Sequence, residues 1–167
     1  MTQKYSHQLI TGISFGLTSG VITALGMMVG LYAATSSKLA VVAGIIVMAI
    51  ADGLADAAGL HMAEEIEVEK GIVKHTHKEV CLTTLFTFLS VAGSILTFAI
   101  PLLIFPIKTA VFVAIGWGML LLILVNFYTA KIKKESPIKL ISEHVLLALF
   151  VIAISCWVGN LIAMWLE

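Results

Sequence analysis

The chain has 167 residues, of which 60% are hydrophobic and only 12% charged, and its mean hydropathy is +1.07. Soluble globular domains are typically about 45–50% apolar and about 25% charged, so this composition excludes an ordinary soluble enzyme, a nucleic-acid-binding protein and a disordered chain. Ten lysines balance ten acidic residues, and arginine is absent, so no net charge attracts nucleic acid. The composition indicates an integral membrane protein whose surroundings are the lipid bilayer.

Five segments of the chain are long and apolar enough to cross a bilayer, which takes about 20 apolar residues per helix. Because no segment alternates with a period of two, helices are favoured over barrel strands. We predict an all-α polytopic membrane protein in which residues 1–167 form a single transmembrane bundle of five helices. The expected helices span about 9–34, 39–61, 80–105, 107–130 and 141–166, with a short acidic cytoplasmic extension at 62–79.

The lysines predict the orientation of this bundle, because cytoplasmic loops carry an excess of positive charge. With a cytoplasmic N-terminus, only Lys38 and Lys108 face the outside. The cytoplasmic side then holds the other eight lysines, namely Lys4, Lys70, Lys74, Lys78, Lys131, Lys133, Lys134 and Lys139. We therefore expect the N-terminus to lie in the cytoplasm.

Glycines recur through the first segment at four-residue spacing. Gly12, Gly16 and Gly20 form one series, and Gly26 and Gly30 repeat the spacing. Small residues one turn apart let helix backbones approach closely in lipid. The pattern predicts tight helix packing or a dimer contact, and it is also compatible with room for a permeating ion.

Two acids, Asp52 and Asp56, lie deep in the second apolar segment. A carboxylate at the bilayer centre costs about 2.5–3.5 kcal/mol even on lenient scales, so such residues are candidates for function. Their spacing places both on one helix face about 6 Å apart, where both ionise only with a cation between them. They either share a proton or hold a metal ion. The alternative is that they form hydrogen bonds to neighbouring helices or stabilise an oligomer.

An acidic run follows the pair at residues 61–69, and no glycine or proline occurs between His61 and Gly71. We expect the second helix to continue through Glu69, which would place Glu67 within about 60° of Asp52 on the helix surface. An acidic track would then lead from the cytoplasm to the pair. The alternative is a plain solvated helix.

His61 adds a nitrogen ligand to the same region. With Glu65 four residues later, or Glu64 three residues later, it offers the mixed nitrogen and oxygen ligands that suit Fe(II), Mn(II) or Zn(II). Met27 and Met28 offer thioethers to a soft metal, although methionine in an apolar helix usually serves packing. The sequence contains no Ser-His-Asp set, P-loop or HExxH motif, so we do not expect an enzyme or a prosthetic group.

Residues 15–31, FGLTSGVITALGMMVGL, resemble the first-helix signature of the vacuolar iron transporter family, FG-x-x-DG-x-x-T-x-LG-x-x-x-G. Residues 53–59, GLADAAG, are similar to that family's A-L-S-M-A-A-G-E stretch. Residues 93–103 resemble its third helix, and 158–162 look like part of its last helix. The resemblance therefore covers essentially the whole chain.

The resemblance implies a homodimeric, proton-coupled exporter of Fe(II), often also of Mn(II). The ion path of the family runs between subunits and is lined by the first two helices. This implies that the path here is lined by Ser19, Thr23, Met27 and Met28 on the first helix. The family often carries a glutamate-rich cytoplasmic segment, of which Glu64, Glu65, Glu67 and Glu69 would be the remnant.

The chain departs from the family at the acids. The first-helix aspartate of the family falls on Ser19, its second-helix methionine on Asp56, and its following glutamate on Leu60, while Asp52 is an addition. Carboxylates are thus lost at two positions and gained at two others. An oxygen-rich site without the thioether favours Mn(II), Fe(II) or Mg(II) over softer metals.

We therefore expect a dimeric transporter that moves a divalent metal, Fe(II) or Mn(II), out of the cytoplasm. Its metal ligands would be Asp52, Asp56, His61, Glu64, Glu65 and Glu67. The alternatives are a membrane-embedded metal-binding or structural protein that has lost transport, and a transporter of another cation such as a small organic one. We expect a prokaryotic cell membrane, or a vacuolar-type membrane in a eukaryote.

Overall fold

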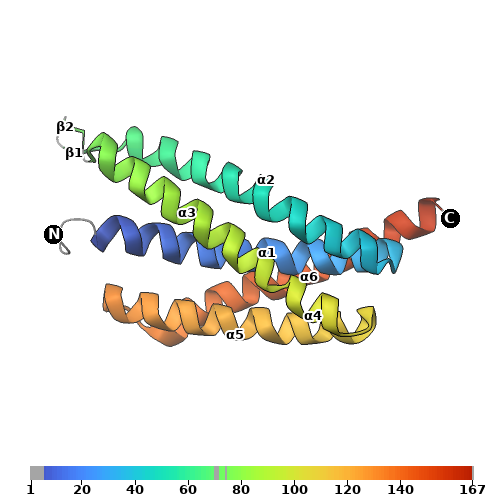
Figure 1. Ribbon diagram of the computed structural model, residues 1–167. Helices are drawn as coiled ribbons and strands as arrows, with labels where there is room; N and C mark the ends of the chain where they lie inside the picture. The colour runs from blue at the N-terminus through green and yellow to red at the C-terminus, as the bar shows by residue number, and fades with distance from the viewer. Residues whose placement is uncertain (1–5, 70–71, 74, 167) are drawn as a thin grey trace.

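A computed structural model describes residues 6–69, 72–73 and 75–166. Within these residues the chain forms six α-helices and one two-stranded antiparallel sheet (Figure 1). The elements in order are α1 (Ser6–Thr35), α2 (Lys38–Glu65), β1 (Val68–Glu69), β2 (Ile72–Val73), α3 (His77–Thr97), α4 (Ala99–Ile104), α5 (Ile107–Lys133) and α6 (Pro137–Leu166).

Five helical stretches are long and apolar enough to cross a membrane: α1, α2, α3 together with α4, α5, and α6. Each contains 27 to 30 residues, which at 1.5 Å per residue exceeds the roughly 30 Å of a bilayer core. The prediction of an all-helical chain with five membrane-length helices is confirmed. This architecture is compatible with an integral membrane protein.

Two predicted helices differ in detail from the structure. The third was expected to run unbroken over 80–105, but α3 ends at Thr97 and α4 begins at Ala99. Pro101 lacks the N–H that would bond to the carbonyl of Thr97, which accounts for a break at this place. The continuation of the second helix through Glu69 is wrong, because α2 ends at Glu65 and a short hairpin follows.

This hairpin pairs Val68 with Val73 and Glu69 with Ile72. Valine and isoleucine favour strands because their branched side chains are restricted in a helix. The predicted extension at 62–79 is therefore the last turn of α2, this hairpin and the first turn of α3. These β-branched residues can be seen in the sequence, and their preference for strands outweighs the absence of a helix-breaking residue.

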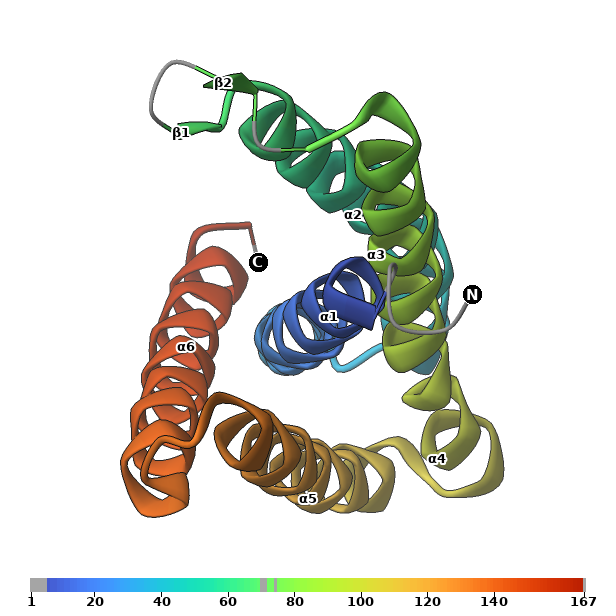
Figure 2. The same ribbon diagram turned by 90° about the vertical axis from the view of Figure 1, so that its left-hand side faces the viewer.

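Helix α1 lies at the centre of the bundle. In Figure 2 the other helices surround it, with α2 and α3 on one side, α5 below and α6 opposite. It packs against α2, α3, α5 and α6. The most deeply buried side chains accordingly include Val21, Leu25 and Met28 of α1, each with no exposed surface.

The glycines of α1 serve two different neighbours. A Cβ at Gly16 would lie 2.8 Å from the carbonyl oxygen of Thr87, and Gly12 and Gly20 meet α3 in the same way. A Cβ at Gly26 would instead lie 2.6 Å from Val151 of α6. The six-residue step from Gly20 to Gly26 turns the helix by about 240°, which moves the second series onto another face.

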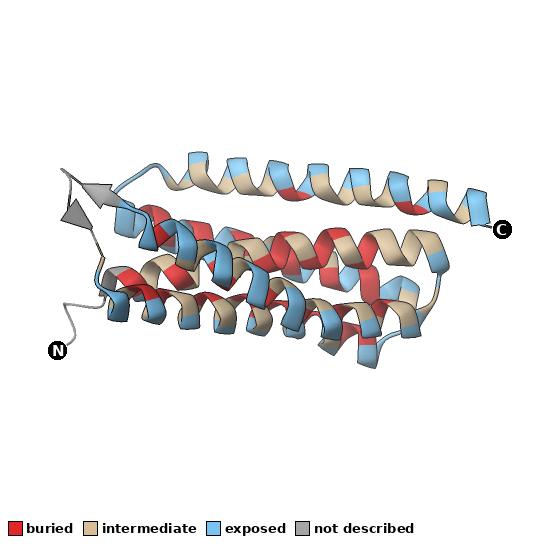
Figure 3. Ribbon diagram, turned by 90° about the horizontal axis from the view of Figure 1, so that it is seen from above, coloured by how far each residue is buried: buried red, intermediate tan, exposed pale blue. Residues whose placement is uncertain are grey.

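Helix α6 is the least covered element. Only Ala148 and Gly159 are buried among its described residues, and Figure 3 shows the helix that leads to the C-terminus as mostly exposed or intermediate. Both α2 and α6 pack on α1, yet they make almost no contact with each other. Helices α2 and α6 therefore flank α1 without packing against each other (Figure 2).

The lysines separate toward the two ends of the bundle. Lys78, Lys131, Lys133, Lys134 and Lys139 lie at the end where α1 begins, and Lys38 and Lys108 lie at the other end (Figure 1). The remaining three lysines of the orientation argument, Lys4, Lys70 and Lys74, lie outside the described residues.

We expect Gly16→Ala to destabilise the fold by about 1–3 kcal/mol, because the added methyl group has no space against α3. Gly93→Ala is the matched control, since a Cβ there meets nothing within 4 Å. Thermal unfolding of both variants in detergent measures the difference. Equal unfolding temperatures would contradict the close approach of α1 and α3.

Candidate metal site between α1 and α2

The Asp52 and Asp56 side chains lie on the α1 side of α2. Helix α2 buries a stripe of residues at four-residue spacing that includes Ala49, Gly53 and Ala57. Each aspartate directly precedes a member of this stripe and is itself half-buried. The two carboxyl groups are close enough to interact electrostatically, as their one-turn spacing predicts.

Thr23 of α1 holds the first carboxylate. Its hydroxyl donates to Asp52 Oδ2 at 2.7 Å, and the carbonyl oxygens of Ser19 and Gly20 are more distant acceptors at 3.0 and 3.3 Å. The short distance is typical of a hydrogen bond to a carboxylate. Thr23 therefore fixes the position of Asp52 across the α1–α2 interface.

Ser19 of α1, one turn before Thr23, lies next to the second carboxylate. Its side chain is a hydrogen-bonding neighbour of the Asp56 carboxyl group. Asp56 Oδ2 is nevertheless buried and has no hydrogen-bond partner among the described residues. A buried polar oxygen without a partner is costly, and this one points to a ligand or proton that would satisfy it.

The two methionines of α1 lie in different surroundings. Met27 continues the face of Ser19 and Thr23, and its sulfur would lie 2.9 Å from a Cβ at Gly44 of α2. Met28 has no exposed surface and belongs to the hydrophobic core. The structure thus places Ser19, Thr23 and Met27 along α2, and Met28 away from that interface.

Glu64 lies two turns beyond Asp56 on α2. Its side chain is only 5% exposed, and Oε2 has no hydrogen-bond partner among the described residues. The same holds for Oε1 of Gln8, which is 4% exposed near the start of α1. Glu64 is therefore a second buried acid with unused ligand capacity, nearer the end of the bundle that carries most of the lysines.

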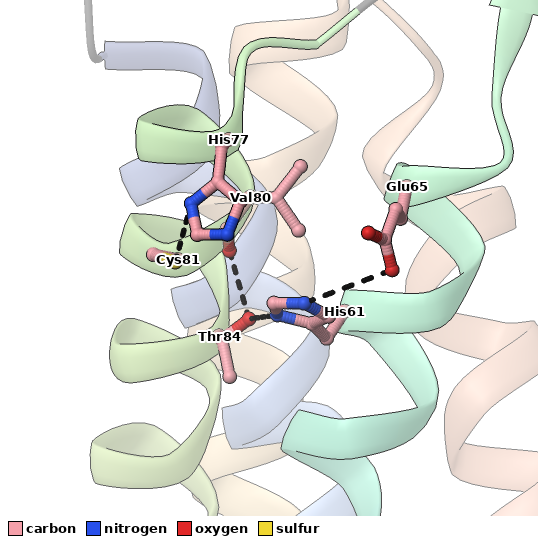
Figure 4. A network of polar contacts seen from close by, with 6 residues as sticks. All are labelled: His61, Glu65, His77, Val80, Cys81 and Thr84. Atoms are coloured by element: carbon pink, nitrogen blue, oxygen red, sulfur yellow. Dashed lines mark hydrogen bonds and ion pairs between the residues drawn. The ribbon is translucent and has the colours of Figure 1, made fainter.

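His61 points toward α3 (Figure 4). Its Nδ1 lies 2.8 Å from Thr84 Oγ1, and the Thr84 hydroxyl donates to the carbonyl oxygen of Val80. Because that hydroxyl has one hydrogen, it accepts from His61, and the proton of a neutral imidazole lies on Nδ1. Nε2 then faces the Glu65 carboxylate at 3.9 Å. His61 therefore approaches Glu65, and the two form an ion pair only when the imidazole carries a second proton on Nε2.

A second pair lies beside this one, where Cys81 Sγ is 3.4 Å from His77 Nδ1 on α3. Figure 4 shows both pairs at the same end of α2 and α3. No group of three or more histidine, cysteine, aspartate or glutamate side chains is arranged for a metal within the described part of the chain. The His61 and Glu65 pair is therefore at most a partial ligand set.

The predicted acidic track does not form as one helical face. Glu67 lies beyond the end of α2 and pairs with His75 Nε2 at 3.0 Å. Glu64 is buried, Glu65 approaches His61, and Glu67 belongs to the segment that leads into the hairpin. The expected position of Glu67 near Asp52 is wrong because it requires a helix that continues past Glu65.

Sequence reasoning placed the aspartates on one face but did not find their partners. The pairing of Thr23 with Asp52 and of Ser19 with Asp56 depends on the register between α1 and α2. The signal for these pairs in the sequence was their equal spacing. A serine and a threonine lie four residues apart on α1, and two acids lie four residues apart on α2.

No protein-family model matches this chain. An uncharacterized protein of Methanocaldococcus jannaschii is 29% identical to it over an alignment of 143 positions, and the aligned part covers 74% of each of the two chains. The name of that relative states no activity. The resemblance to vacuolar iron transporters therefore stays a prediction.

We expect Thr23→Val to lower the free energy of unfolding by about 1–3 kcal/mol, because Asp52 Oδ2 loses its donor. A double-mutant cycle of Thr23→Val with Asp52→Ala should give a clear coupling energy. The control is a double-mutant cycle of Thr109→Val with the same Asp52→Ala change. Thr109 is exposed, so this cycle should give no coupling energy. Additive effects for Thr23 and Asp52 would show that their contact contributes nothing to stability.

Proposed function

We propose that the protein transports a divalent metal ion, Fe(II) or Mn(II), out of the cytoplasm, and that Asp52 and Asp56 bind the ion within the membrane. The observation that carries this proposal is the buried Oδ2 of Asp56, which has no hydrogen-bond partner among the residues that the structure describes and lies one helical turn from a second carboxylate. Ionisable residues inside a membrane are costly and usually functional. A cation between the two carboxylates removes their repulsion and satisfies the unpartnered oxygen.

The ligands available around the pair are oxygens. Two carboxylates come from α2 and two hydroxyls from Ser19 and Thr23 of α1. Oxygen ligands suit Mn(II), Fe(II) and Mg(II) better than soft metals. Met27 lies along the same interface, but its sulfur is beside Gly44, eight residues before Asp52 on α2, so the ligands around the pair itself are oxygens.

The departures from the family pattern support the same location. The family's first-helix aspartate corresponds to Ser19, and Ser19 is a neighbour of Asp56. The carboxylate missing from α1 therefore has a counterpart directly across the interface on α2. The chain keeps negative charge at this point of the bundle while changing the helix that carries it.

The remaining parts of the proposal rest on charge and on the resemblance. With the lysine-rich end in the cytoplasm, Glu64, Glu65 and Glu67 lie at the cytoplasmic end of α2 and attract cations to it. The site belongs to a homodimer, in which the partner packs against α1 between α2 and α6, two helices that make almost no contact with each other. Exchange against protons accounts for release of the ion, because each vacated carboxylate can take one up.

We expect Asp52→Asn/Asp56→Asn to abolish Mn(II) flux into vesicles reconstituted with the purified protein, because the amides keep the shape but remove the charge. Glu143→Gln is the control, since Glu143 is an exposed acid on α6 and should leave the flux unchanged. Undiminished flux in the aspartate double variant would refute the proposed site. Flux that ignores an imposed pH gradient would argue against proton exchange.

Metal binding can be tested apart from transport. We expect Mn(II) or Fe(II) to raise the unfolding temperature of the wild-type protein in detergent, because a ligand of the native state stabilises it by RT ln(1 + [L]/Kd). The increase should vanish in Asp52→Asn/Asp56→Asn and persist in Glu143→Gln. Binding without flux would support the membrane-embedded binding protein instead. No stabilisation by any divalent metal would favour another substrate, such as an organic cation.

A further inference from the structure

A cavity of about 600 Å³ lies between α1, α5 and α6, in the half of the bundle where α1 begins. Along α1 it extends from Ile10 to Thr23, a distance of about 20 Å at 1.5 Å per residue. One leaflet contributes about half of a bilayer core that is roughly 30 Å thick. The cavity therefore spans the roughly 15 Å of one leaflet's hydrocarbon and extends about 5 Å beyond it.

The surface of this cavity is mostly apolar, with side chains such as Phe15, Ile22 and Leu147 in its wall. Much of its polar lining is already bonded to the protein. Thr129 donates to Ser14 at 3.1 Å, Asn126 donates to the carbonyl oxygen of Leu122, and Thr23 donates to Asp52. These groups have little need of water or of a polar ligand.

The charged group of the lining is at the rim. Lys133 lies in the last turn of α5 and lines the cavity, and it forms no ion pair with any residue that the structure describes. The neighbouring Lys131 differs, because its ammonium group lies 4.6 Å from the centre of the Phe127 ring. An unpaired ammonium group above an apolar cavity fits a molecule with an anionic head and an apolar tail.

We propose that this cavity binds one anionic phospholipid, with its phosphate at Lys133 and an acyl chain along α1 between α5 and α6. Basic groups at the cytoplasmic ends of transmembrane helices commonly bind anionic head groups, and the volume is within the usual range for ligand pockets. The cavity wall also contains Ser19 and Thr23. The bound chain therefore lies directly behind the hydroxyls that contact Asp52 and Asp56 and keeps water from them on that side.

Native mass spectrometry of the delipidated protein in detergent tests the site with two lipids that have identical acyl chains, phosphatidylglycerol and phosphatidylcholine. We expect one phosphatidylglycerol per chain, retained at least fivefold more tightly than phosphatidylcholine. Lys133→Gln should weaken phosphatidylglycerol binding by about fivefold, the effect of one interfacial lysine. Lys131→Gln should leave it unchanged.

The position of the acyl chain needs its own pair of variants. Leu147 and Leu149 are both 49% exposed on α6, but only Leu147 lines the cavity. We expect Leu147→Trp to occupy the space and to reduce retention of both lipids, whereas Leu149→Trp should not. Thermal unfolding of each variant in detergent checks that it is folded.

Several results would overturn the proposal. Equal retention of the two lipids would exclude recognition of the head-group charge, and equal losses in the two lysine variants would show only general surface attraction. Undiminished binding in Leu147→Trp would place the lipid elsewhere. Displacement of phosphatidylglycerol by an equal concentration of inorganic phosphate would show that the anion alone is recognised. None of these measurements depends on metal transport.

Discussion

Close approach of helix backbones around α1 is the constraint on which the rest of the bundle depends. Lipid offers no hydrophobic drive for helices to associate, so van der Waals contact between small residues must hold them together. Gly16 and its neighbours one turn away bring α3 against α1, while Gly26 and Gly30 bring α6 against another face. With α1 held from two sides, the hydroxyls on its remaining face have fixed positions, and α2 presents its carboxylates to them.

Much of this architecture could be predicted because long apolar segments and glycine spacing are properties of a single helix. The five membrane-length helices and the packing role of the α1 glycines follow from such local patterns. The break between α3 and α4 and the early end of α2 depend on competing local preferences. The missing N–H of Pro101 determines the break between α3 and α4, and the β-branched residues after Glu65 determine where α2 ends. The hydropathy of these segments indicates neither boundary.

The candidate site was less accessible from the sequence, since it depends on contacts between helices. The spacing of Asp52 and Asp56 places them on one face, but periodicity gives no rotation of α2 relative to α1. Their partners Ser19 and Thr23 therefore required the structure. For the same reason Met27 and Met28, adjacent in the chain, could not be assigned separately to the interface and the core.

The two contacts between α1 and α2 have equal spacing on both helices, four residues from Ser19 to Thr23 and four from Asp52 to Asp56. Because the helices are antiparallel, a slide of α2 by one turn, about 5.4 Å, would bring one acid opposite the hydroxyl that the other had left. Only one of the two pairs could re-form. The two polar contacts therefore define one alignment of α1 and α2 in which both acids have a hydroxyl partner. In an alignment shifted by one turn in either direction, only one of the two acids has such a partner.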